Sequence, residues 1–184
     1  MFSRHSSQFT DVTSTLPSKG AMVTMTNDTH LETRTGWLAA GQIKPGDAVA
    51  TLDGGFADVS WVGRVKPSDD LFFVPAGVLE NCSPLILPGD TRVGIQAPLN
   101  FDATSDHISL PLAAFAGTAG ICKTKRASVS MRTFGFETEE MIWAQTGSLL
   151  HARPMSDAFF HSLRFAEARA FLALYGPTHN AVAA

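Results

Sequence analysis

Glycine and proline divide most of this chain into short runs. The sequence of 184 residues contains 15 glycines and 10 prolines, and between residues 20 and 154 they recur at short intervals. Both residues are frequent in turns, and the runs between them have the length of strands rather than of long helices. This spacing predicts a mainly β protein of about ten short strands.

Two of the turns are expected to close β-hairpins. Asn27-Asp28 separates two Thr-rich runs, and Asp53-Gly54-Gly55 separates two further candidate strands. Asn, Asp and Gly tolerate the left-handed conformations that tight hairpin turns require. The expected strands are residues 22–26, 29–35, 48–52, 56–65, 71–74, 84–87, 92–96, 107–112, 127–136, 140–144 and 149–152.

The pattern changes to a helical one at Pro154. Ser156 suits an N-cap, Asp157 suits the first turn of a helix, and Gly176-Pro177 suits its end. The apolar residues between them recur at helical spacing: Phe159, Phe160, Leu163, Ala166, Ala170, Phe171 and Leu174. An amphipathic C-terminal helix is therefore expected within residues 154–176, packed on the β-body or on a partner.

The length fits one domain with short additions at its ends. Residues 1–19 are rich in Ser and Thr and are expected to form a flexible arm. Residues 20–153 form the predicted β-domain, residues 154–176 the helix, and residues 177–184 a tail.

Composition excludes several classes of protein. A hydrophobic fraction of 45% and a charged fraction of 17% indicate a folded chain, and a net charge of −3 does not favour nucleic acid as a partner. No apolar run approaches the roughly 18 residues of a membrane-spanning helix, and the first residues do not resemble a secretory signal. The two cysteines do not make a disulfide framework, which leans the expected location towards the cytoplasm.

Four stretches of the β-region occur in a distinctive order. The most specific is IKPGDAVATLDGG at residues 43–55, continued by VSWVGR at residues 59–64. The others are residues 20–24, residues 75–79 with 90–93, and residues 136–147. Together they resemble the Hint (Hedgehog/intein) domain, in its bacterial stand-alone or appended branch. This resemblance implies a compact Hint-like β-fold.

The resemblance also implies where a reaction would occur. An active Hint domain begins with a Cys or Ser that attacks the preceding carbonyl group, and it uses histidines for proton transfer. The matching positions of this chain hold Leu16, Thr91, Thr133 and Glu139. Leucine has no nucleophilic atom, and a threonine hydroxyl does not titrate near pH 7. We therefore expect a degenerate site without cofactor or metal, in a binding or structural module rather than an enzyme.

Two enzymatic alternatives remain open from the sequence. A displaced nucleophile among Ser14, Thr15 and Ser18 would make the chain self-cleaving. A thiol–imidazole pair of Cys82 and His151 would make it a hydrolase for an external substrate, although a buried cysteine more often acts as a small apolar side chain.

Other polar groupings favour ordinary surface roles. His179-Asn180 resembles the dipeptide that ends inteins, but the next residue, Ala181, cannot accept an acyl group. His30 and Glu32 share a strand face without a visible third metal ligand. The adjacent carboxylates Asp69-Asp70 and Glu139-Glu140 are expected to be solvated. We also expect the chain to bind an unknown protein partner, or a second copy of itself, through the C-terminal helix.

Overall fold

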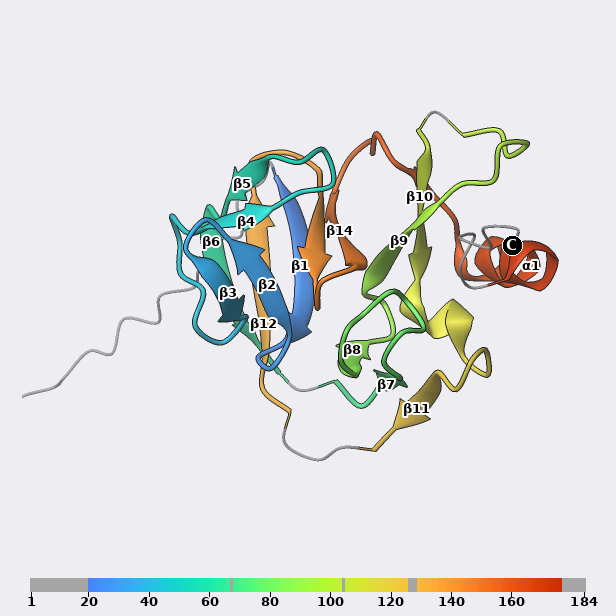
Figure 1. Cartoon of the computed structure of the whole chain (residues 1–184), viewed down its shortest axis with the longest axis horizontal. Helices are drawn as coiled ribbons and strands as arrows, with labels where there is room; N and C mark the ends of the chain where they lie inside the picture. Colours follow the sequence, from blue (N-terminus) through green and yellow to red (C-terminus); the bar gives the residue numbers. More distant parts are fainter. Residues whose placement is uncertain (1–19, 67, 104, 126–128, 177–184) are drawn as a thin grey trace, which may run out of the picture.

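Short strands make up most of the molecule in the computed structural model, which describes residues 20–66, 68–103, 105–125 and 129–176 (Figure 1). These residues form fifteen strands, a 3₁₀ helix and an α-helix. The elements are β1 (Ala21–Thr26), β2 (His30–Thr33), β3 (Gly36–Ala39), β4 (Ala48–Ala50), β5 (Phe56–Asp58), β6 (Trp61–Val65), β7 (Leu71–Val74), β8 (Leu85–Pro88), β9 (Arg92–Gln96), β10 (His107–Pro111), η1 (Leu112–Phe115), β11 (Cys122–Thr124), β12 (Met131–Phe136), β13 (Glu140–Ala144), β14 (Ser148–Pro154), β15 (His161–Ser162) and α1 (Phe165–Tyr175).

The strands pair almost entirely in the antiparallel sense. A 12-stranded sheet follows the order β15-β10-β9-β14-β13-β2-β4-β5, with β1, β12, β6 and β3 joined to it off this path. A separate three-stranded sheet has the order β11-β7-β8. The short contact between β10 and β15 is parallel. The expected mainly β class with one C-terminal helix is confirmed.

The hairpin predicted at Asp53-Gly54-Gly55 is confirmed. Strands β4 and β5 pair across it, Gly54 has a φ of +79°, and Asp53 Oδ1 accepts the amide of Gly55 at 3.1 Å. The chain then leaves the hairpin at Val59-Ser60, so the single strand expected over residues 56–65 is divided into β5 and β6.

The hairpin predicted at Asn27-Asp28 is wrong, although a turn does form there. Strand β1 pairs with β12 along its whole length and with β14 at its start, whereas β2 pairs with β3, β4 and β13. Because other strands occupy the edges of β1, the turn directs the chain into another part of the sheet.

The helix predicted from Ser156 begins nine residues later, at Phe165, and contains 11 residues. The preceding segment is extended because its backbone bonds to the β-body: the amides of Phe159 and Phe160 donate to Glu139, and the amide of Leu163 donates to the carbonyl of Ser109. Glu167 accepts the amide of Arg164 and caps the helix start at 2.7 Å. The helix buries its inward face on the β-body near η1 and β10, through Ala168, Phe171 and Leu172.

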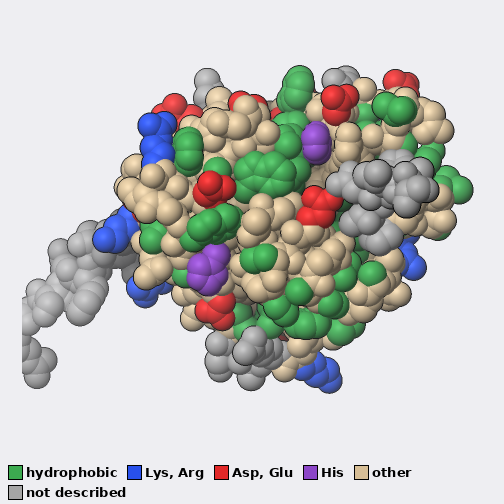
Figure 2. All heavy atoms as spheres, viewed as in Figure 1, with side chains coloured by type: hydrophobic (Ala, Val, Ile, Leu, Met, Phe, Trp, Pro, Cys, Tyr) green, Lys and Arg blue, Asp and Glu red, His purple; other side chains and the backbone are tan. Residues whose placement is uncertain are grey.

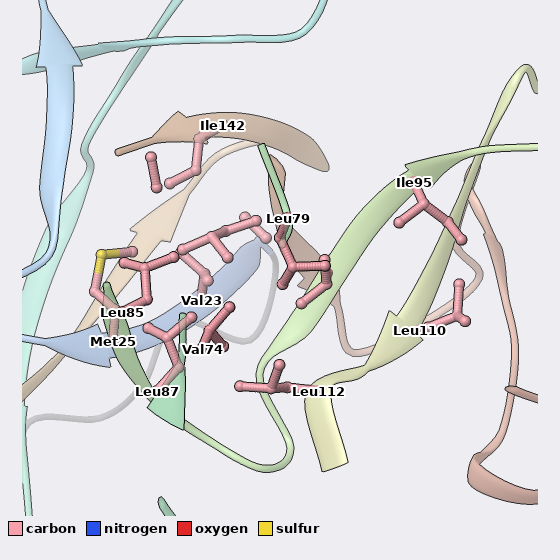
Figure 3. Close-up of a cluster of buried hydrophobic side chains, with 14 of the residues drawn as sticks. Val23, Met25, Val74, Leu79, Leu85, Leu87, Ile95, Leu110, Leu112 and Ile142 are labelled. Atoms are coloured by element: carbon pink, nitrogen blue, oxygen red, sulfur yellow. The ribbon is translucent and has the colours of Figure 1, made fainter. Parts of the chain in front are cut away.

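A single apolar core joins the two sheets and the helix. Figure 3 shows part of it, where Val23 and Met25 of β1 lie near Leu85 and Leu87 of β8. Burial of such side chains stabilises a fold by about 1.5–3 kcal/mol each. This core packs against β1, which pairs with β14 at its start.

Candidate functional site

A cavity of about 360 Å³ opens where β1 begins. It lies against β1, β9 and β14, which follow one another in Figure 1 through the pairings of β1 with β14 and of β14 with β9. Side chains two residues apart on a strand share a face, so Met22 and Thr24 of β1 and His151 and Arg153 of β14 are placed together. The lining consists of Met22, Val23, Thr24, Asp90, Thr91, Arg92, His151, Arg153, Pro154 and Met155.

Thr91, predicted as a site residue, lies in this cavity and is almost fully buried. Its Oγ1 donates a hydrogen bond to the carbonyl oxygen of Thr24 at 3.0 Å. Its own carbonyl accepts the amide of Leu112 at 2.9 Å. The hydroxyl therefore fixes the backbone of β1 beside the cavity.

Thr133, the second predicted position, lies on β12 opposite β1. It is 7% exposed, and its Oγ1 is 2.6 Å from Oγ1 of Thr24, its register partner across the sheet. The two hydroxyls satisfy each other between neighbouring strands. Thr24 thus connects both predicted threonines, one through its carbonyl and one through its side chain.

Glu139, the third predicted position, belongs to a buried polar network. The expectation that it is solvated is wrong, because its side chain is only 10% exposed and one of its oxygens lies 2.7 Å from Nε2 of His151. The carboxylate also accepts the amides of Phe159 and Phe160. On the other side of the ring, Nδ1 of His151 lies 2.8 Å from Oγ of Ser109.

The two contacts define the protonation of His151. A carboxylate only accepts, so Nε2 carries a proton and donates it to Glu139. Burial lowers the pKa of His151, an effect that Glu139 opposes and that the positive charges of Arg92 and Arg153 reinforce. The ring is therefore neutral at pH 7, and Nδ1 accepts the proton of the Ser109 hydroxyl.

Ser109, His151 and Glu139 follow the order of a nucleophile, a base and an orienting carboxylate. Ser109, however, has 0% of its surface exposed and is not among the residues that line the cavity. The hydroxyl is therefore not presented to this cavity. The network joins β10, β14 and the segment before the helix, and its role here is to hold these elements together.

Cys82 and His151 are not brought together. Cys82 is exposed, contrary to its expected burial, and its amide bonds to the carbonyl of Gln145 in the turn between β13 and β14. Strand β14 begins after this turn, at Ser148, and His151 lies three residues further along it. Three residues of a strand span about 10 Å. Both of its ring nitrogens already have partners.

Most of the remaining predicted residues lie beyond the part of the chain that the structure describes. Leu16, Ser14, Thr15 and Ser18 lie outside the described residues, as do His179 and Asn180. Within the described part of the chain, no three His, Cys, Asp or Glu side chains are grouped to hold a metal ion. Asp70 forms an exposed ion pair with Lys123 at 2.7 Å, as expected of a solvated carboxylate.

Two arginines of the cavity were missed by sequence reasoning. Arg92 is half-buried and donates from Nη1 to the carbonyl of Leu163 at 2.6 Å. Arg153 is exposed at the end of β14, next to Pro154. The alternation of His151 and Arg153 along one strand was the available signal, but their meeting with Arg92 depends on the pairing of β14 with β9.

Comparison with known proteins returned solved structures alone. No family model matches the chain, and no curated protein matches it. The MchDnaB-1 intein matches with 14% identity and a TM-score of 0.46, over 70% of this chain and 99% of that one. The Msm DnaB1 intein splicing domain bound with zinc matches with 19% identity and a TM-score of 0.43, over 72% of this chain and 99% of that one. Separately, no helix of the described residues is long and apolar enough to cross a membrane.

Proposed function

We propose that this chain is a Hint-like domain that does not process itself and that acts as a binding or structural module. The proposal rests on one observation: the side chains at the positions matching the Hint proton-transfer groups are committed to internal hydrogen bonds. Thr91 donates to a β1 carbonyl, Thr133 pairs with Thr24, and Glu139 bonds to His151.

Self-processing requires a group that moves a proton at the reacting carbonyl. Thr91 is the polar side chain that contacts the β1 backbone at the cavity, and it donates to the carbonyl oxygen of Thr24. A threonine polarises a carbonyl in this way but does not exchange protons near pH 7. His151, the histidine of the cavity, already bonds at both nitrogens. These contacts favour a static role.

Intact mass spectrometry of the purified full chain tests the proposal. The protein is incubated for days with dithiothreitol or hydroxylamine, reagents that cleave thioesters and esters formed by an acyl shift. A Thr91→His variant, which introduces the histidine of the Hint pattern, is treated in parallel. We expect both masses to stay at the full value, because a histidine alone does not supply a nucleophile.

A mass shortened from one end in the unmodified chain would contradict the proposal and support the self-cleaving alternative. Variants Ser14→Ala, Thr15→Ala and Ser18→Ala would then identify the nucleophile, since replacing that residue abolishes shortening. Hydrolysis of added thioester or ester substrates, lost in Cys82→Ser, would instead support the thiol hydrolase.

A further inference from the structure

Two arginine side chains from different strands line the cavity beside β1. Arg92 belongs to β9 and Arg153 to β14, and both line the same volume of about 360 Å³. Arginine presents several donors in a planar fork, which matches the oxygen pairs of carboxylates and phosphates.

The positive charge of this cavity is incompletely compensated. In the described part of the chain, the ion pairs within 4.0 Å are Lys123 with Asp70 and His151 with Glu139, and neither arginine takes part. Asp90 also lines the cavity and attracts Arg92, but it stands against two arginines.

The electrostatics of Arg92 point the same way. Burial lowers its pKa most, and repulsion by Arg153 lowers it further, whereas attraction by Asp90 raises it. The two arginines also lower the pKa of His151 at the cavity wall. An anion placed between the guanidinium groups would relieve both repulsions.

The arginines differ in how firmly they are held. Nη1 of Arg92 donates to the carbonyl of Leu163, which orients that guanidinium and leaves its other donors for a ligand. Arg153 is exposed at the rim and is able to adjust to a ligand. Thr24 and Thr91 also line the cavity.

We propose that this cavity binds an oxyanion, the carboxylate or phosphate group of a ligand, between the guanidinium groups of Arg92 and Arg153. The inference deepens the binding role proposed above and rests on it. It gives that role a chemical class of ligand, because guanidinium donors match an oxygen pair and the charged side chains of the lining, Asp90, Arg92 and Arg153, carry a net positive charge.

Titration of the full chain with inorganic phosphate and with succinate, at ionic strength held constant with sodium chloride, tests the site. Nitrogen–proton NMR spectra follow the Nε–Hε signals of the arginines and the amides of Thr24 and Thr91. We expect saturable shifts at these signals for at least one probe, and the tighter probe identifies the group as phosphate or carboxylate.

Three variants locate the binding. Arg153→Gln should weaken it about tenfold, since a charged hydrogen bond is lost. Asp90→Asn should strengthen it about twofold, since a repelling charge is removed from the cavity. The matched control Arg34→Gln removes the same charge from an exposed residue that does not line the cavity and should leave the affinity within about twofold.

Shifts that grow linearly without saturation, or equal weakening by Arg153→Gln and Arg34→Gln, would overturn the oxyanion site. The failures of the two proposals are distinguishable. A chain that shortens itself but binds phosphate at Arg153 overturns the absence of self-processing, whereas an intact chain that binds neither probe overturns the oxyanion site alone.

Discussion

The imidazole of His151 lies between Ser109 and Glu139, with Nδ1 2.8 Å from the serine Oγ and Nε2 2.7 Å from the glutamate Oε1. The same carboxylate accepts the amides of Phe159 and Phe160. One buried network thereby connects β10, β14 and the segment that leads to the helix.

Stability is expected to fall as pH decreases from about 7.5 to 5.5. Burial lowers the folded-state pKa of His151 below the ordinary histidine value of about 6.5. The unfolded chain then binds more protons in this range, so the free energy of unfolding decreases as pH falls through 6.5, by at most about 1.4 kcal/mol per pH unit for one group. Burial also lowers the pKa of His107, which therefore contributes to the slope with the same sign. Urea midpoints measured at several pH values check the slope.

His151→Gln separates the two histidines. It should reduce the slope and leave the part due to His107. A stability that rises on acidification in the unmodified chain would show that His151 is charged, not neutral, in the folded protein.

Glu139→Gln should destabilise the fold by about 2 kcal/mol. The neutral amide replaces a carboxylate that accepts three hydrogen bonds, and bonds to charged groups contribute about 1.5–3 kcal/mol. Glu137→Gln is the matched control, because Glu137 is exposed two residues away. Urea unfolding at pH 7 measures both. Equal effects of the two variants would contradict a structural role for the Glu139 network.

Thr133→Val should cost about 1 kcal/mol, because it leaves Oγ1 of Thr24 without its partner at 2.6 Å. The double variant Thr24→Val with Thr133→Val should lose less than the sum of the single variants, since no hydroxyl is left unpaired. Thermal unfolding of the unmodified chain, the two single variants and the double variant measures these changes in stability. Additive effects would mean that the two hydroxyls do not stabilise each other.

Gly135→Ala should destabilise the fold by about 2 kcal/mol through steric overlap. A Cβ at Gly135 would lie 1.8 Å from Nε1 of Trp61, its register partner on β6. Combined with Trp61→Ala, the same substitution should cost much less, because the indole that it meets is gone. Guanidinium unfolding checks this difference, and a cost independent of Trp61 would exclude the steric explanation.

Apolar and charged side chains are interspersed on one face of the molecule (Figure 2). The face in Figure 2 shows apolar groups dispersed among polar atoms, with charges of both signs. Large apolar residues that are exposed include Met155 at the cavity, Phe159 in the segment before the helix and Leu174 on the helix. Binding of a partner or a second copy through the helix stays a prediction, and sedimentation of the full chain tests for the second copy.

Local features were predictable where neighbours in sequence decide them. Asp53 bonds the amide of Gly55 two residues away, so its turn could be recognised from the residue types. The turn at Asn27 was recognised for the same reason, but its strands pair elsewhere, because pairing depends on β12, more than a hundred residues distant. The predicted start of the helix was wrong because Glu139, twenty residues upstream, accepts the amide of Phe159, which Ser156 was expected to cap.

The amino-acid sequence by itself determined the strand-forming runs, their turns and the stop of the helix at Gly176, since these depend on the conformational preferences of single residues and their neighbours. Tertiary structure alone decided which polar groups meet. Ser109, Glu139 and His151 form one network, and Arg92 and Arg153 one cavity, because sheet pairing brings distant strands within the few ångströms over which hydrogen bonds and charges act.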